Sequence, residues 1–305
     1  MPRISVVTSL YCVGPYVDEF HARSCEALKK IPGDHEFVFV DDGSPDDARD
    51  RAIALISKDA RVRVIELSRN FGQHRALWIG LQQARGELVF LVDADLEEDP
   101  GLVAQFYAKM QEAHGEADVV YGVMEERKGG AIERIGGALF YSLINRLSDM
   151  PLPRNVMNAR LMTRAYVDAL LKFGDAEPFL GGLMILTGFR QIAVACAKES
   201  KGTSAYTFRR KLRLALDALF ALSTKPMTWI LWAGVWIAAA GLAGVFGVLR
   251  GGGGATALAL ASVWLMGGLV LMAVGTVGAY VGRVLTQTRG RPTAIVRRIH
   301  DAGPR

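Results

Sequence analysis

The sequence predicts an α/β domain with a mostly parallel sheet and helices on both of its faces, followed by juxtamembrane amphipathic helices and two transmembrane helices. Three observations lead to this prediction. Short apolar runs rich in β-branched residues alternate with amphipathic stretches over residues 1–125, which is typical of strands joined by crossover helices. A basic amphipathic stretch follows at residues 205–227. Two long stretches near the C-terminus then carry no charge.

The predicted strands are five, and they lie near Ile4 to Leu10, Glu36 to Asp41, Val62 to Leu67, Leu88 to Val92 and Val119 to Val123. The helices predicted between them lie near Tyr16 to Lys30, Asp46 to Ser57, Gln73 to Ala84 and Pro100 to Ala113. A ligand crevice is expected where the strands end, as in other open α/β sheets. A further helical pattern, Ile132 to Leu147, fits a core helix and an interfacial helix equally well.

The two charge-free stretches predict two membrane spans. Thr228 to Leu249 holds 22 residues and Ala255 to Gly282 holds 28, and about 20 are enough to cross a bilayer as a helix. A buried helical hairpin in a soluble protein is the alternative, but core helices rarely lack charge for so long. Lys and Arg flank both stretches, whereas the connector contains only Arg250, so both ends are expected on the cytoplasmic side.

These features divide the chain into four parts: a cytoplasmic domain (1–204), a juxtamembrane amphipathic helix (205–227), a transmembrane hairpin (228–282) and a cytoplasmic basic tail (283–305). The net charge of +5 is concentrated beside the predicted spans, which favours a lipid bilayer as partner and not nucleic acid. The three cysteines show no paired spacing and no signal peptide precedes the first strand, which fits a reducing compartment.

Acidic residues follow two of the predicted strands. The second strand ends in Asp41-Asp42-Gly43-Ser44, and the fourth in Asp93-Ala94-Asp95. Two carboxylates within one turn can hold a divalent cation beside phosphate groups, although Asp-x-Asp alone is a weak signal. The first strand lacks the glycine pattern of dinucleotide-binding folds, which argues against hydride transfer.

The order of these motifs resembles a known family. Val40 to Pro45 followed by Phe90 to Leu96 resembles the nucleotide-sugar domain of the family 2 inverting glycosyltransferases, which have the type-A glycosyltransferase fold. Ser68-Arg69-Asn70-Phe71-Gly72-Gln73 is similar to an element of the polyprenyl-phosphate branch, which includes dolichyl-phosphate mannose synthases and bactoprenol glucosyltransferases. Gly202 to Tyr206 and Tyr280 to Arg283 extend the resemblance over nearly the whole chain.

The resemblance implies roles for the residues that match the family's motifs. Asp41 would contact the base, Asp93 would place the nucleotide and ribose, and Asp95 would bind Mg or Mn. Glu97 either assists with the metal or only favours the start of a helix through its charge. We assign to the nucleotide-sugar site Thr8, Tyr11, Asp41, Asp42, Asn70, Asp93 and Ala94; to the metal Asp93, Asp95 and Glu97; and to catalysis Asp93, Asp95 and Arg160.

The pattern breaks in two places. Ser9 and Cys12 replace a proline and an asparagine that are common in relatives, and Asn158 stands where relatives carry an acid that organises the acceptor site. A phosphate monoester, with a second pKa of about 6, needs no general base, so Asn158 is compatible with a lipid-phosphate acceptor. Arg160, Lys198 and Lys201 are the expected ligands of that phosphate, unless the lysines are merely solvated.

The leading hypothesis is a metal-dependent, inverting transfer from a UDP- or GDP-sugar to a polyprenyl phosphate of the undecaprenyl type, at the cytoplasmic face of the bacterial inner membrane. Two alternatives remain. The acceptor could be a hydroxyl of a glycolipid or polysaccharide, with His21, Asp149, Asp175 or Glu177 as base, or the chain could be a catalytically weak nucleotide-sugar-binding anchor. Two spans are too few to carry the product across a membrane, so a separate flippase or a homo-oligomer is expected.

Overall fold

The computed structural model describes residues 2–124, 156–174, 178, 180–196, 255–288, 290 and 292–303. The chain divides into two compact units. The larger unit comprises Met1–Ile135, Pro153–Ala205 and Pro292–Arg305. The smaller comprises Gly136–Leu152 and Tyr206–Arg291.

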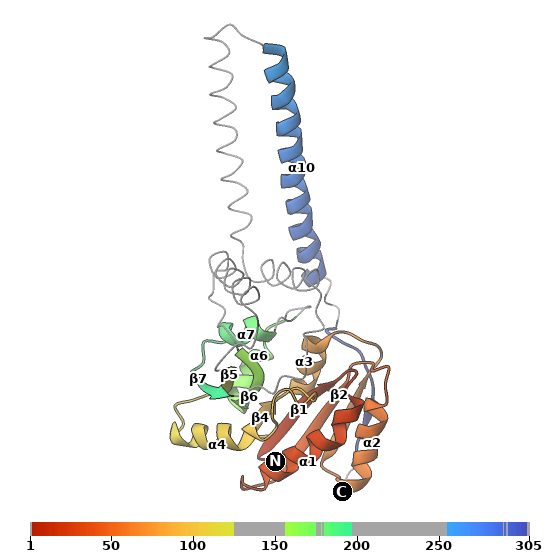
Figure 1. Ribbon diagram of the computed structural model, residues 1–305, viewed down its shortest axis with the longest axis vertical. Coiled ribbons are helices and arrows are strands. Elements are labelled where there is room, and N and C mark those ends of the chain that lie inside the picture. Colours follow the sequence, from red (N-terminus) through yellow and green to blue (C-terminus); the bar gives the residue numbers. More distant parts are fainter. Residues whose placement is uncertain are drawn as a thin grey trace. The chain divides into compact units, whose positions relative to one another are not determined.

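The larger unit is built on one sheet, which has eight strands within the described residues, in the order β7-β5-β6-β4-β1-β2-β3-β8 (Figure 1). The strands are β1 (Ile4–Leu10), β2 (His35–Asp41), β3 (Val62–Leu67), β4 (Leu88–Leu91), β5 (Val119–Met124), β6 (Val156–Thr163), β7 (Gln191–Cys196) and β8 (Val296–His300). The five predicted strands are therefore confirmed almost to the residue, and β6, β7 and β8 were not predicted.

Four of the strand pairings are parallel: β1 with β2, β1 with β4, β2 with β3, and β5 with β7. β6 runs antiparallel to both β4 and β5, and β8 runs antiparallel to β3. In the parallel half the carboxyl ends of β1, β2 and β4 reach the same edge of the sheet, which brings the acidic segments after β2 and β4 to one side.

Helices cover both faces of this sheet, as predicted (Figure 1). One apolar core joins the sheet to α1 (Val17–Leu28), α2 (Ala48–Lys58) and α4 (Leu102–Glu112). The other joins it to α3 (Gln73–Gln83), α6 (Arg164–Leu170) and α7 (Leu180–Leu186). Successive side chains of β1 point to opposite faces of the sheet. Ile4 and Val6 therefore enter the first core and Val7 enters the second.

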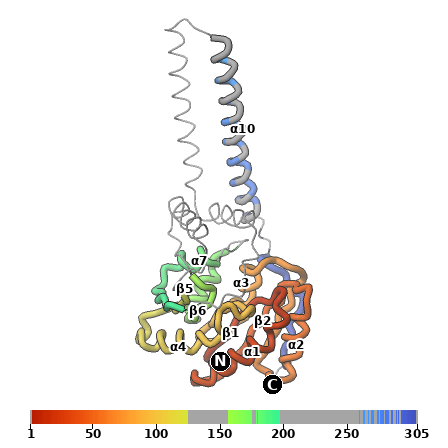
Figure 2. The backbone as a smooth tube through the Cα atoms, viewed as in Figure 1, coloured from red at the N-terminus to blue at the C-terminus, as the bar shows by residue number. Residues whose placement is uncertain are grey.

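The C-terminal residues complete the sheet. In Figure 2 the blue end of the chain lies beside the orange part of the tube, and β8 pairs with β3 from Val64↔His300 to Leu67↔Val296. The predicted basic tail, 283–305, is thus not a separate segment throughout, since residues 292–305 belong to the larger unit. Two adjacent arginines separate the apolar Val296 from Ile299, so β8 lacks the alternation that would reveal a strand within a basic run.

In the smaller unit the structure describes the helix α10 (Ala255–Thr288), which contains the second predicted span. The first, residues 228–249, lies outside the described residues, as do the amphipathic helix at 205–227 and the pattern at 132–147. Among the residues that are described, no helix meets the length and apolarity needed to cross a membrane. The predicted pair of spans is therefore not supported by the structure.

Candidate functional site

Two buried carboxylates end strand β2. Asp41 and Asp42 are each 2% exposed, and burial raises the pKa of both above the ordinary value for aspartate. Asp41 accepts the backbone N–H of Ser44 at 3.0 Å, which closes the turn that follows the strand. Asp42 accepts the backbone N–H groups of Phe71 and Gly72 at 2.7 and 2.9 Å. Asp42 therefore fixes the loop before α3, the segment that carries the Arg-Asn-Phe-Gly element.

Gly43 allows the two loops to approach. Its φ of +63° is one that side chains rarely adopt, and a Cβ there would lie 2.7 Å from the backbone nitrogen of Asn70. Asn70 itself is exposed, and Arg69 packs over the ring of Phe71 at 4.1 Å. The loop thus places the exposed Asn70 against the turn after β2, beside Asp41 and Asp42.

The second acidic segment follows β4. Asp93 is partly buried, and its two carboxylate oxygens accept the side-chain amides of Gln73 at 2.7 Å and Asn158 at 2.8 Å. Ala94 is 2% exposed and points into the core, so the carboxylates of Asp93 and Asp95 can both face the edge of the sheet. Asp95 is partly buried and accepts the backbone N–H of Glu97 at 2.9 Å.

The donor atoms at this edge suit Mg or Mn. Carboxylate oxygens are the ligands that these hard cations prefer, and such ions are often held by one or two carboxylates together with substrate phosphates. Within the described residues Asp93, Asp95 and Glu97 do not gather as three ligands of one ion. The arrangement fits a cation that completes its coordination with oxygens of a bound ligand.

Glu98 fixes the strand on the other side of this edge. It is 2% exposed, and its two oxygens accept the backbone N–H groups of Asn158 and Ala159 at 2.9 and 2.7 Å. These bonds hold the start of β6 against the turn after β4, and they direct the amide of Asn158 to Asp93. Neither Gln73 nor Glu98 was among the predicted site residues.

Arg160 lies in β6 and is 6% exposed. Its guanidinium donates to the carbonyl oxygens of Asn158 at 3.1 Å and Met157 at 3.0 Å, and its other terminal nitrogen contacts the sulfur of Met184. Burial lowers its pKa from an ordinary value far above neutrality. In this conformation Arg160 shapes the strand beside Asp93, and its contact with an acceptor phosphate stays a prediction.

The remaining predicted residues fall into three groups. Tyr11 is 49% exposed just after β1, at the same edge as Asp41. Thr8 is 1% exposed, and its hydroxyl has no hydrogen-bond partner in the part of the chain that the structure describes. Lys198 and Lys201 lie outside the described residues, as do Asp149, Asp175 and Glu177, the alternative bases.

His21, the other alternative base, lies toward the opposite end of the strands from the acidic segments. It belongs to α1 and contacts Asp59, which precedes the amino end of β3. The acidic segments instead follow the carboxyl ends of β2 and β4. His21 is therefore not placed to serve as the base for a hydroxyl acceptor.

The comparisons with known proteins agree with this geometry. The family model of Glycosyl transferase family 2 matches residues 5–171, which include both acidic segments and Asn158. A relative from Mycobacterium tuberculosis named among putative glycosyltransferases is 42% identical over 98% of this chain and 89% of its own length. The chain belongs to glycosyltransferase family 2. It is a glycosyltransferase, and the sequence-based assignment is confirmed.

Two further comparisons bear on the branch and the fold. An undecaprenyl-phosphate 4-deoxy-4-formamido-L-arabinose transferase from Pseudomonas paraeruginosa is 28% identical over 99% of this chain and 91% of its own length. Mannosyl-3-phosphoglycerate synthase from Rubrobacter xylanophilus superposes with a TM-score of 0.51 at 18% identity, covering 72% of this chain and 73% of that structure. That likeness shows the type-A glycosyltransferase fold alone.

Proposed function

We propose that this glycosyltransferase moves a sugar from a UDP- or GDP-linked donor to a polyprenyl phosphate of the undecaprenyl type, with inversion at the anomeric carbon. The observation that carries the proposal is the side chain of Asn158, an amide that donates to Asp93 at 2.8 Å and cannot act as a general base. A phosphate oxygen is already a nucleophile at neutral pH, because the second pKa of a phosphate monoester is about 6.

The transfer breaks one bond and forms one. An oxygen of the lipid phosphate attacks the anomeric carbon, and the bond from that carbon to the donor diphosphate breaks, with its electron pair leaving on the nucleoside diphosphate. No proton has to move when the attacking phosphate is a dianion. The sugar ends in a phosphodiester to the lipid, and the configuration at the anomeric carbon is inverted.

Different residues would bind the nucleotide of the donor and the metal at its diphosphate. Asp41 would contact the base and Asp93 the ribose, with Asn70 and Tyr11 also at the nucleotide, and Asp42 holds the loop of Asn70. Asp93 and Asp95 would hold Mg or Mn, which neutralises charge on the departing diphosphate when it is bound. Gln73 and Asn158 fix the Asp93 carboxylate in place before the donor arrives.

We further propose that the reaction takes place at the cytoplasmic face of the bacterial inner membrane, with the charge-free stretches 228–249 and 255–282 as the segments that hold the chain at the bilayer. A lipid acceptor calls for an anchor near the bilayer, and both stretches lack charge. On α10, apolar side chains recur along one line and are exposed, which is typical of a surface that meets lipid or protein: Val263, Met266, Val270, Val274, Val277 and Val281.

The decisive experiment supplies the purified full-length chain with Mn²⁺ and a panel of radiolabelled UDP- and GDP-sugars, with and without undecaprenyl phosphate. Label that enters the organic phase only with the lipid phosphate supports the proposal and names the donor. Label that enters a glycolipid or polysaccharide acceptor, but not undecaprenyl phosphate, would replace it with transfer to a hydroxyl. Alkali treatment and analysis of the anomeric linkage then test the inversion.

A further inference from the structure

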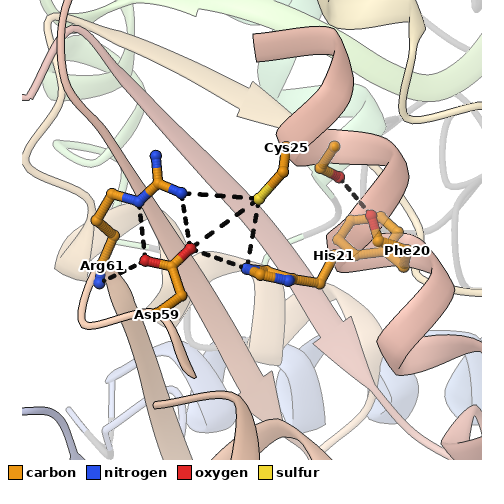
Figure 3. Close-up of polar contacts among 6 residues, drawn as sticks. Phe20, His21, Cys25, Asp59 and Arg61 are labelled. Carbon is orange, nitrogen blue, oxygen red and sulfur yellow. Dashed lines mark hydrogen bonds and ion pairs between the residues drawn. The ribbon is translucent and has the colours of Figure 1, made fainter. Parts of the chain in front are cut away.

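A second cluster of polar side chains lies at the opposite end of the strands from Asp41 and Asp93. It consists of His21 and Cys25 from α1 and Asp59, the residue that follows α2 and precedes β3 (Figure 3). His21 and Cys25 are four residues apart, so they share one face of α1, and Figure 3 shows both directed at the Asp59 carboxylate. The proposed transfer does not use any of the three.

The spacing of the three donor atoms matches one face of a coordination tetrahedron. His21 Nε2 lies 3.1 Å from Asp59 Oδ2, Cys25 Sγ lies 3.5 Å from His21 Nε2, and Cys25 Sγ lies 4.0 Å from Asp59 Oδ2. Zinc bonds of about 2.0–2.3 Å in tetrahedral geometry put neighbouring ligand atoms roughly 3.3–3.8 Å apart. Shifts of a few tenths of an ångström would therefore suffice.

The burial, packing and chemical type of these side chains suit the binding of a cation. The side chains of His21 and Asp59 are 13% and 12% exposed, so they are largely withdrawn from solvent yet still accessible to an ion. The His21 ring packs edge-on against Phe37 at 4.7 Å, which limits its rotation. One imidazole, one thiolate and one carboxylate make a mixed donor set that suits zinc better than magnesium or calcium.

Arg61 sets the direction of the Asp59 carboxylate. Its backbone N–H and its Nε both donate to Oδ1, at 3.0 and 2.8 Å, which leaves Oδ2 turned toward His21 and Cys25. Its Nη2 reaches Oδ2 at 2.8 Å and Cys25 Sγ at 3.8 Å. A bound cation would displace only this last nitrogen, while the two bonds to Oδ1 persist and orient the ligand from outside.

We propose that His21, Cys25 and Asp59 form a zinc-binding site, distinct from the Asp93–Asp95 edge, that ties α1 to the turn before β3. Water takes the fourth position, so the ion exchanges with solution. The spacing of the three donor atoms, and the direction that Arg61 gives to the Asp59 carboxylate, are the reasons to prefer a metal over a reactive cysteine.

Cobalt substitution of the full-length protein tests the site without relying on activity. The protein is treated with a chelator and titrated with Co²⁺ in the presence of excess Mg²⁺, which occupies all-carboxylate sites. A thiolate-to-cobalt charge-transfer band should appear at one equivalent, together with strong visible bands of tetrahedral cobalt, and Zn²⁺ should displace both. Carboxylates alone cannot produce the thiolate band, so the Asp93–Asp95 edge cannot mimic it.

Matched variants assign the ligands. Cys25→Ala should abolish the band, and His21→Gln and Asp59→Asn should each weaken Co²⁺ binding by about 10-fold or more, the scale on which losing even an orienting partner weakens metal sites. Cys12→Ala, which removes an exposed thiol elsewhere, should leave the titration unchanged. Should Cys25→Ala misfold, protection of Cys25 from alkylation by Zn²⁺ in the wild type provides the same information by mass spectrometry.

The proposal is overturned by a wild-type protein that gives no thiolate band and no zinc protection of Cys25. A band that survives Cys25→Ala, or that Cys12→Ala removes, would equally overturn it by moving the ligand elsewhere. Zinc should also raise the melting temperature of the wild type and not that of Cys25→Ala. An equal rise in both would show that zinc stabilises the protein at another site.

Discussion

The two acidic segments at the carboxyl edge of the sheet are built in different ways. Asp41 and Asp42 are almost wholly buried and accept backbone N–H groups, so their surroundings are fixed by the course of the main chain. Asp93 and Asp95 are partly exposed, and Asp93 is held by the side-chain amides of Gln73 and Asn158. The first segment supports the site, and the second retains the access to solvent that chemistry on a charged donor needs.

The largest effect is expected from Asp95→Asn. If the partly exposed segment holds the metal that would neutralise the leaving diphosphate, product formation should fall by roughly 10²–10³-fold, with little change in melting temperature. The measurement is label recovered in the organic extract at saturating donor and Mn²⁺. Asp99→Asn, which changes an exposed carboxylate nearby, is the matched control and should keep near wild-type activity. Comparable activity in Asp95→Asn and the control would remove Asp95 from the mechanism.

The buried segment should respond mainly in stability. Asp42→Ala leaves the N–H groups of Phe71 and Gly72 without their acceptor, which should lower the free energy of unfolding by about 2–3 kcal/mol. Thermal unfolding reports this loss, and the KM for the donor should rise because the loop of Asn70 is released. Asp50→Ala, at an exposed ion pair, should shift stability by only about 0.5 kcal/mol. Equal shifts in the two variants would contradict a supporting role for Asp42.

Asn158→Asp tests whether Asp93 depends on a neutral partner. The new carboxylate would stand where the amide now donates at 2.8 Å, so repulsion should displace Asp93 or force one of the two acids to take a proton. Product formation on undecaprenyl phosphate should fall about 10-fold, a scale set by one pKa unit of interaction. Asn158→Ala, which removes the bond without adding charge, should fall less. Increased transfer to a hydroxyl acceptor in Asn158→Asp would instead reveal a missing base.

The smallest effect is a pH dependence of stability. Because burial raises the pKa of Asp41, the folded chain binds this proton more tightly than the unfolded chain, and protonation favours folding. Its contribution to stability should be full below about pH 4, the ordinary range of an unfolded aspartate, and should decline as pH rises through the raised folded value. Thermal unfolding of the wild type and Asp41→Asn checks this. The difference in melting temperature, wild type minus variant, should fall with rising pH. An increase would contradict the prediction that protonation of Asp41 favours folding.

The parallel half of the fold was predicted well because its strands are buried on both faces and read as continuous apolar runs, as in Phe37 to Val40. It missed β6 and β8 for a physical reason. β6 carries Asn158 and Arg160 within an apolar run, and β8 is an edge strand with two arginines, so neither shows a simple pattern.

The position of the acidic segments was predicted, and the roles of their residues stay predictions. Both acidic segments were placed at the correct edge, because the strands that precede them were recognised. The contacts of Gln73 and Glu98 join positions 20 and about 60 residues apart, which no local pattern can reveal. Arg160 was assigned to the acceptor from the resemblance, and in the structure its guanidinium turns inward to main-chain carbonyls.

Strand β8 has a practical consequence for producing the enzyme. Residues on both sides of Tyr206–Arg291 belong to the larger unit, so this stretch is an insertion between two parts of one folding unit. A gene that simply stops at codon 205 would delete β8 and leave the backbone of β3 open to intermolecular pairing, a recognised route to aggregation. A soluble version should instead splice residue 205 to residue 292 through a flexible linker, so that the last strand still closes the sheet.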